Sequence, residues 1–200
     1  MSQPARTLDQ FAIQGRSALV TGGASGLGLA YVEAMAEAGA KVTIADIDRE
    51  GGEREAARLR AEGFDVRAAV LDVVDRAATG RVFAEHAAAF GGLDIAFANA
   101  GIDPGAGYWN PAGHRNADGQ IDTLDPARWD RAIAINLTGV FNTVREAARL
   151  MKPALRGSII ATSSNAALIN EPIVGTAYMP AKAGVGWMPC TDPDPPRPSA

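Results

Sequence analysis

Apolar and polar residues alternate along this chain in a way that predicts strands separated by helices. Apolar runs of strand length alternate with runs whose apolar residues recur at helical spacing. Strands that alternate with helices imply a parallel sheet covered on both faces, and right-handed crossovers give it a doubly wound order. We therefore expect an α/β fold with a single doubly wound sheet in three layers. The expected strands are 17–20, 41–46, 66–71, 93–98 and 157–164, and the expected helices between them are 29–38, 49–62 and 75–90.

Residues 102–125 interrupt this rhythm and are rich in Gly, Pro, Asn and Asp. A connection of this length is typical of a lid or a binding loop, and a solvated insertion is an equal alternative. Its His114 is interpreted as a surface residue. Asp125 and Pro126 then predict a helix start, with an N-cap followed by proline in the first turn.

The segment from 126 to about 151 is expected to form one long helix with a broad apolar stripe. Asn136 lies near its middle, where a polar amide is unexpected unless it faces solvent. His86, in the helix before the fourth strand, has no partner motif, and no chemistry is assigned to it.

Composition narrows the class of protein. A chain of 200 residues suits one domain, which we place at 1–188, and its net charge of −4 without a basic stripe argues against a nucleic-acid partner. No apolar run is long enough to span a membrane, and the polar stretch 1–10 has no signal-peptide pattern, so a cytoplasmic protein is expected. The single cysteine, Cys190, excludes an intrachain disulfide and a thiolate metal cluster, and no metal site is predicted.

Three glycines mark the turn between the first strand and the first helix. Gly22, Gly26 and Gly28 lie where side chains would obstruct the turn, the approach of a ligand or the packing of helix on strand. The free amides at the helix start form an anion site suited to a pyrophosphate. Asp46 ends the second strand about 20 residues further on, where a carboxylate can bind the adenosine ribose. The pattern predicts a dinucleotide site that favours NAD over NADP, although the nearby Arg49 weakens that preference.

Further polar residues lie at strand ends. Asp72 and Asn99 follow the third and fourth strands, and Ser163 and Ser164 end the fifth. Ligands of such sheets bind beyond the carboxyl ends of the strands, so these groups are expected to meet at one site.

Tyr178 and Lys182 are four residues apart at the start of a short helix, which places them on one face. A free tyrosine has a pKa of about 10, and a neighbouring ammonium favours the phenolate. Such a pair can act as a general acid or base.

Taken in chain order, these motifs resemble the short-chain dehydrogenase/reductase family over roughly residues 15–188. The resemblance implies that Tyr178 is the acid/base and that Lys182 favours its phenolate and holds the nicotinamide ribose. It also implies that Ser164, with Ser163 as the alternative, binds the substrate oxygen, and that Asn136 orders a water linked to Lys182. The implied cofactor contacts are Gly22, Ser25, Gly26, Leu27 and Gly28 at the pyrophosphate, Asp46 at the ribose, Asp72 and Val73 near the adenine, Asn99 and Ala100 at the central ribose, and Tyr178 and Lys182 at the nicotinamide end.

By resemblance the protein is an NAD-dependent alcohol dehydrogenase or ketoreductase that acts on a small molecule as a homodimer or homotetramer. A cofactor-binding protein with weak or no catalysis is the alternative. After Met188 the composition becomes Pro-rich, so 189–200 is expected to be disordered. Because the family continues with further strands, we expect the sheet to lack its usual last strands. The chain is interpreted as a truncated or frameshifted form of a longer dehydrogenase, with a regulatory short form as the other possibility.

Overall fold

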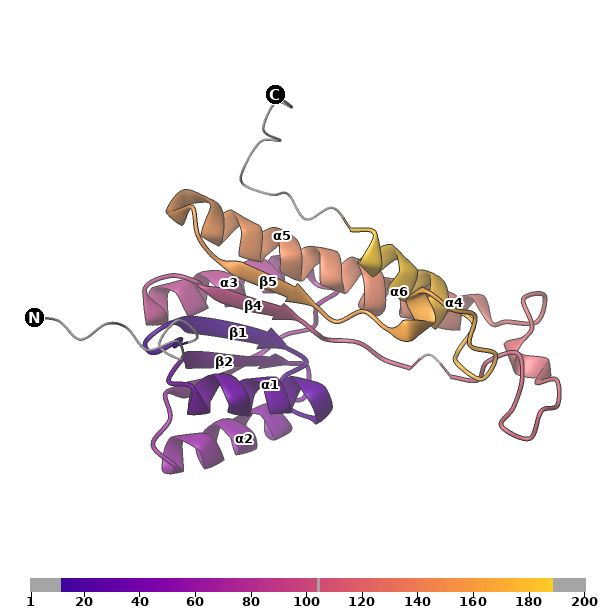
Figure 1. Ribbon diagram of the computed structural model, residues 1–200, viewed down its shortest axis with the longest axis horizontal. Coiled ribbons are helices and arrows are strands. Elements are labelled where there is room, and N and C mark those ends of the chain that lie inside the picture. The colour runs from indigo at the N-terminus through magenta and orange to yellow at the C-terminus, as the bar shows by residue number, and fades with distance from the viewer. Residues whose placement is uncertain (1–11, 104, 189–200) are drawn as a thin grey trace, which may run out of the picture.

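A five-stranded parallel sheet forms the centre of the molecule, and its strand order is β3-β2-β1-β4-β5 (Figure 1). The computed structural model describes residues 12–103 and 105–188. The predicted α/β class and single doubly wound sheet are confirmed. The expected stretch 1–10 and the expected Pro-rich tail lie outside the described residues. The strands are β1 (Ser17–Thr21), β2 (Lys41–Asp46), β3 (Val66–Val70), β4 (Ile95–Ala98) and β5 (Ser158–Ala161).

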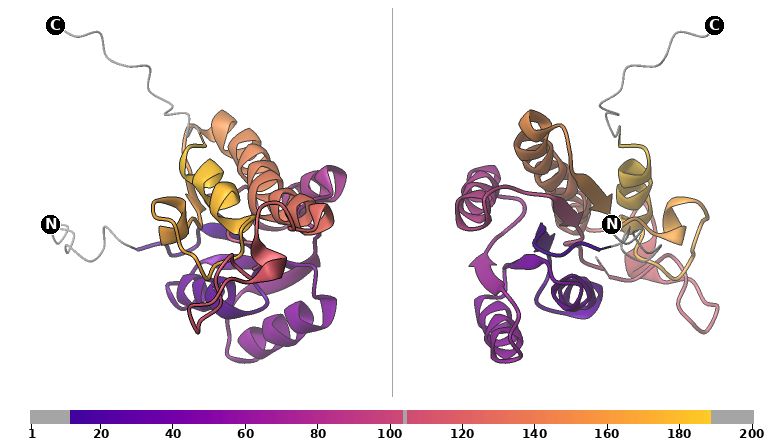
Figure 2. Two further views of the ribbon diagram at one scale, coloured as in Figure 1. Left: turned by 90° about the vertical axis from the view of Figure 1, so that its right-hand side faces the viewer. Right: turned by 60° about the vertical axis from the view of Figure 1, so that its left-hand side comes forward.

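Helices cover both faces of the sheet (Figure 2). On one face lie α1 (Gly26–Glu37) and α2 (Arg49–Ala61), and on the other lie α3 (Arg76–Phe90) and α5 (Val140–Met151). Alternate side chains of β1 lie on opposite faces of the sheet. Ala18 and Val20 pack towards α1 and α2, whereas Leu19 packs towards α3 and α5. In the ranges described, every helix is too short or too polar to cross a bilayer.

The helical segment predicted as one long helix is divided into three parts. α4 (Pro126–Ile133) is followed by a π-helical segment, η3 (Ala134–Gly139), and then by α5. Asn136 lies in this wider segment and is fully buried, so the solvent-facing alternative is wrong. A π segment inserts an extra residue into the helix and often marks a functional site. Periodicity alone did not reveal it, because the apolar residues of 126–151 recur at steps of three and four throughout the segment.

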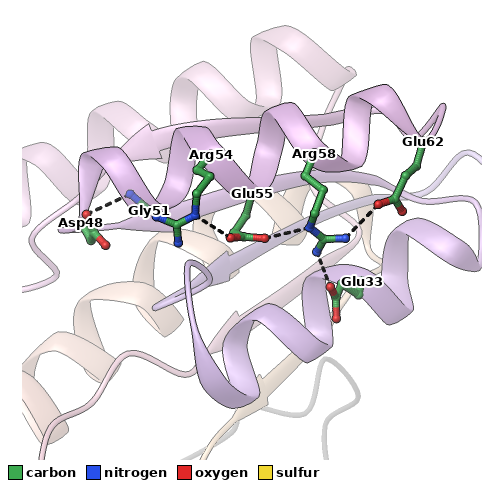
Figure 3. A network of polar contacts seen from close by, with 7 residues as sticks. All are labelled: Glu33, Asp48, Gly51, Arg54, Glu55, Arg58 and Glu62. Carbon is green, nitrogen blue, oxygen red and sulfur yellow. Dashed lines mark hydrogen bonds and ion pairs between the residues drawn. The ribbon is translucent and has the colours of Figure 1, made fainter.

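A polar network joins α1 to α2 on the surface (Figure 3). Arg58 of α2 donates to Glu55 at 2.9 Å and Glu62 at 3.0 Å on its own helix, and it also pairs with Glu33 of α1. These carboxylates, Glu55 above all, raise the pKa of the Arg58 guanidinium. The network therefore fixes two neighbouring helices at a distance from the strand ends.

Every labelled strand in Figure 1 points towards the same end of the molecule, where the connection 102–125 and α6 (Tyr178–Gly186) lie. The connection contains one short 3₁₀ turn, η2 (Ala117–Gly119), and an antiparallel bridge between Trp109 and Arg115. Two further 3₁₀ turns, η4 (Lys152–Ala154) and η5 (Asn165–Ala167), flank β5. α6 begins at Tyr178, as the position of Pro180 predicts.

Candidate active site

The turn after β1 has space only for glycine at two positions. A Cβ on Gly28 would lie 1.9 Å from the carbonyl oxygen of Gly22, and a Cβ on Gly22 would lie 2.8 Å from Cα of Ala100. Gly22 and Gly26 also have positive φ angles of 67° and 53°. The sequence pattern therefore corresponds to an actual close approach of three backbone segments.

The start of α1 differs from the starts of the next three α-helices. Asp48, Asp75 and Asp125 each accept a backbone N–H as side-chain caps of α2, α3 and α4. Ser25 occupies the same position in α1 and makes no side-chain capping bond. The first amides of α1 are thus left for another acceptor, and the helix dipole favours an anion there.

Thr21 and Asn99 join the ends of β1, β4 and β5. The Thr21 hydroxyl donates to the Phe97 carbonyl at 3.0 Å and accepts the amides of Asn99 at 3.1 Å and Ala100 at 3.3 Å. The Asn99 amide donates to the carbonyls of Thr21 at 3.2 Å and Gly22 at 3.3 Å, and its oxygen accepts from Thr162 at 3.1 Å. Thr21 was not predicted as a site residue, although a polar residue at the end of a fully buried strand was an available signal.

Asp46 faces the glycine turn from the end of β2. Its two carboxylate oxygens accept the amides of Ala24 and Asp48, each at 3.0 Å. These bonds fix the carboxylate beside the turn and leave further acceptor positions on both oxygens. Arg49 begins α2 and does not line the cavity described below, whereas Ile47 does.

Lys182 and Tyr178 lie one above the other on α6. The Lys182 ammonium is 5.5 Å from the centroid of the Tyr178 ring and donates to the Thr162 carbonyl at 2.7 Å. Lys182 is buried, with a relative exposure of 2%, and this burial lowers its pKa. α6 thus places a desolvated ammonium over the Tyr178 ring at the cavity wall.

The two serines after β5 have different environments. Ser163 donates to the Lys182 carbonyl at 3.1 Å and is not a lining residue of the cavity. Ser164 lines the cavity, and its hydroxyl accepts the Ala166 amide at 3.2 Å as the cap of η5. The Ser164 hydroxyl also donates to Oδ1 of Asn165 at 3.2 Å. Of the two serines, Ser164 is the one that borders the cavity.

Asn136 lies behind the cavity wall. Its side-chain oxygen accepts the Ile102 amide at 2.9 Å, and its nitrogen donates to the Ile102 carbonyl at 3.0 Å. A Cβ on Gly101 would lie 2.8 Å from this oxygen and 3.6 Å from Nζ of Lys182, so Gly101 separates the two side chains. Asn136 therefore fixes the backbone after β4, and the water expected beside it stays a prediction.

Most of these groups line one cavity of about 690 Å³. This volume is within the usual range of ligand sites. Of the predicted site residues, only Gly26 and Asn136 do not line it. The volume of the cavity, the open amides of α1 and the carboxylate of Asp46 fit a dinucleotide. The predicted residues that line it are Gly22, Ser25, Leu27, Gly28, Asp46, Asp72, Val73, Asn99, Ala100, Ser164, Tyr178 and Lys182; the unpredicted ones are Ile47, Leu71, Gly101, Ile102, Asp103, Arg131, Ile135, Thr162 and Val174.

Neither histidine belongs to the cavity. His114 is exposed in the connection 102–125. His86 is fully buried on α3, where its Nδ1 is 2.8 Å from the Thr43 hydroxyl and burial lowers its pKa to about 4. No partner of His86 was predicted, because Thr43 is 43 residues away along the chain.

Comparison with known proteins agrees with this geometry. Residues 16–189 match the short chain dehydrogenase family. The chain is 34% identical over 178 residues to versicolorin reductase 1 of Aspergillus parasiticus, a match that covers 88% of this chain and 62% of that protein. It is 37% identical over 171 residues to cis-4-hydroxycyclohexanecarboxylate dehydrogenase of Sinomonas cyclohexanicum, covering 85% and 63%. The chain thus spans about three fifths of the length of these relatives.

A solved short chain dehydrogenase/reductase from Burkholderia phymatum, in complex with NAD, has a similar structure. The TM-score is 0.78 with 29% sequence identity, and the match covers 88% of this chain and 58% of that one.

Proposed function

The chain belongs to the short-chain dehydrogenase family, and we propose that it is an NAD-linked oxidoreductase that interconverts a secondary alcohol and a ketone. One observation carries the proposal. A single cavity contains the glycine turn and Asp46 at one side and Ser164, Tyr178 and Lys182 at the other. A bound nicotinamide cofactor supplies the hydride donor or acceptor, and the residues of the chain supply the remaining chemistry.

NAD is the proposed cofactor because of the groups around Asp46. Its carboxylate would accept hydrogen bonds from ribose hydroxyls and would repel a 2′-phosphate. Ser25 and Ile47, which line the same part of the cavity, provide no cation for that phosphate. The open amides of α1 would hold the pyrophosphate, and Asn99 and Ala100 would lie along the central ribose.

Tyr178 is proposed to move the substrate proton. In oxidation its phenolate accepts the proton of the alcohol, and in reduction its hydroxyl donates a proton to the forming alkoxide. Lys182 stabilises the phenolate electrostatically, and Ser164 hydrogen-bonds the substrate oxygen. Asn136 acts from behind the wall by holding Ile102, and ordering a water linked to Lys182 is part of the same proposal.

A ring-borne secondary alcohol is the proposed substrate class. One relative is named for a hydroxylated cyclohexanecarboxylate. The cavity wall near Tyr178 includes the apolar side chains of Ile102 and Val174, which suit a carbocycle.

A homodimer or homotetramer is also proposed. Phe141, on α5, is 45% exposed and borders a groove of about 340 Å³. Val144, Ala148 and Met188 also line this groove, together with the basic residues Arg145, Arg149 and Lys152. Light scattering at micromolar concentration tests this, and a monomer contradicts it.

The test combines binding with turnover. Calorimetry with NAD and NADP should show tighter binding of NAD, and the absorbance of reduced nicotinamide should change with a panel of cyclohexanols and cyclohexanones. Tyr178→Phe should lower turnover by ~10²–10⁴-fold and leave NAD affinity nearly unchanged. NAD binding without turnover of any substrate would support the alternative of a cofactor-binding protein, and tighter binding of NADP would contradict the role given to Asp46.

A further inference from the structure

The connection after β4 and the loop before α6 meet along a seam outside the cavity. We call residues 105–123 the insertion and residues 170–177 the α6 loop. The Trp109 amide donates to the Pro172 carbonyl at 2.9 Å. The Tyr108 hydroxyl donates to Oδ1 of Asn170 at 2.9 Å, and the Thr176 hydroxyl donates to the Gly119 carbonyl at 2.6 Å. Three hydrogen bonds thus join segments that are more than fifty residues apart.

Backbone packs directly on backbone at this seam. A Cβ on Gly107 would lie 2.4 Å from the Pro172 carbonyl oxygen and 2.5 Å from that of Val174. A Cβ on Gly119 would lie 2.0 Å from the Gly107 carbonyl oxygen. Gly107 and Gly119 are buried, although most side chains of the insertion are exposed. The part of the insertion that is packed is therefore the part that holds the α6 loop.

The insertion has its own internal bonds. Nε2 of Gln120 donates to the carbonyls of Tyr108 and Asn116, each at 2.8 Å. Trp109 and Arg115 form a short antiparallel bridge. These contacts hold the insertion in a defined shape. The position of the insertion therefore determines the position of the α6 loop that it contacts.

The α6 loop leads directly into the cavity. Val174 lines the cavity, and the Gly175 carbonyl accepts the Tyr178 amide at 2.8 Å in the turn that begins α6. The backbone at Ile102, just before the insertion, lines the same cavity and is held by Asn136. A displacement of the seam would therefore move the substrate wall and the first turn of α6, while the glycine turn of β1 would stay in place.

We propose that the insertion is a positioning element that sets the substrate wall and thereby selects which alcohols fit. Gly107 of the insertion and Thr176 of the α6 loop are the main positioning residues, because they act through Val174 and Tyr178 and lie outside the cavity lining. The selectivity in this proposal rests on the proposed oxidoreductase function. The mechanical link between insertion and α6 loop does not depend on that function.

The selectivity test uses three variants of the full chain. Thr176→Val has nearly the same shape but cannot donate to Gly119, Thr176→Ser restores the donor, and His114→Ala changes an exposed residue of the insertion away from the seam. With NAD, cyclohexanol is compared with a cyclohexanol that carries a bulky 4-alkyl group. Thr176→Val should shift the ratio of the two kcat/KM values about tenfold, mainly through KM for the alcohols, because a loosened wall discriminates less well. The affinity for NAD should be unchanged, and Thr176→Ser and His114→Ala should behave as the parent chain does.

Amide hydrogen exchange tests the mechanical link without turnover. Thr176→Val and Gly107→Ala should accelerate exchange at Trp109 and across 172–178, and exchange in β1 and β2 should stay at the parent rate. A chain that turns over no alcohol removes the proposed function and the selectivity with it, while the exchange result still decides whether the insertion holds the α6 loop. Unchanged exchange across 172–178, or faster exchange with unchanged selectivity in an active enzyme, overturns the proposal.

Discussion

The two sides of the cavity are built in different ways. The cofactor side consists of the glycine turn, Thr21 and Asp46, which lie at the ends of neighbouring strands and are held by hydrogen bonds between their side chains and the backbone. The substrate side consists of two loops that are joined by a few hydrogen bonds and by the packing of Gly107 on the α6 loop. The cofactor side is therefore attached directly to the strands of the sheet. The two loops of the substrate side are attached to the sheet only where each loop begins and ends.

This difference implies that the two sides can be changed separately. A backbone-defined pocket tolerates almost no added atoms, so a substitution there should abolish cofactor binding. A wall formed by two loops can shift by small amounts, so substitutions there should alter selectivity and leave cofactor binding intact. The following predictions test this separation, beginning with the largest expected effect.

Gly28→Ala should disrupt the cofactor side of the cavity and leave the substrate side unchanged. The new Cβ would lie 1.9 Å from the Gly22 carbonyl oxygen, so the turn must move away from its present position. We expect NAD affinity to fall by about 100-fold or more, with a loss of ~1–3 kcal/mol in the free energy of unfolding. Calorimetry and denaturant titration measure both. Gly52→Ala is the control, since its Cβ would have ordinary contacts of 3.7 Å or more; equal NAD affinity in the two variants would contradict the close-packed turn.

Acid should destabilise the packing of α3 against the sheet, because His86 of α3 is buried there beside Thr43 of β2. Burial disfavours the charged imidazolium of His86 and lowers its pKa from the ordinary value of 6.5 to about 4. The folded-state pKa is lowered, so the stabilisation is complete above pH 6.5 and is lost as the pH falls from 6.5 towards 4. The loss should total about 3 kcal/mol in the free energy of unfolding, measured by denaturant titration at several pH values.

The matched variants for this pH dependence are His86→Leu and His114→Ala. His86→Leu should remove most of the dependence between these pH values, and His114→Ala should keep it because His114 is exposed. A pH profile that is the same in His86→Leu and in the parent chain would show that other groups cause the acid sensitivity.

Thr21→Val should loosen the junction of β1 and β4. The amides of Asn99 and Ala100 would lose their acceptor. A buried donor left without a partner costs ~1–3 kcal/mol, so unfolding should become easier by about this amount, and NAD should bind somewhat more weakly. Thr21→Ser keeps the hydroxyl and should recover most of the loss. If the serine variant is no better than the valine variant, packing rather than hydrogen bonding explains the role of Thr21.

Arg58→Gln should have the smallest effect. Its ion pairs join α1 to α2 on the surface, where water and salt screen them. We expect a slightly lower melting temperature that approaches the parent value as salt is added, and unchanged NAD affinity. A marked loss of NAD affinity would mean that the α1–α2 surface supports the cofactor side, and the separation described above would then fail.

Some features of this protein could be predicted from its sequence because they depend on residues close together in the chain. The alternation of strands and helices predicted the doubly wound sheet, and the glycine spacing predicted a turn in which Gly22 and Gly28 have no space for a side chain. The position of Pro180 predicted that α6 begins at Tyr178. Steric and backbone requirements of this kind are local, so a short pattern can express them.

Other features depend on residues that are distant in the chain and were decided only by the tertiary structure. The burial of Asn136 in a π segment, the position of Ser164 rather than Ser163 at the cavity, and the partner of His86 each depend on a remote backbone or side chain. The insertion contained a clear loop composition, yet nothing in it indicated that Gly107 and Gly119 would pack against the α6 loop. Sequence patterns predict elements and their ends because those follow from local sterics, whereas contacts between loops appear only when the sheet brings both loops to the same edge.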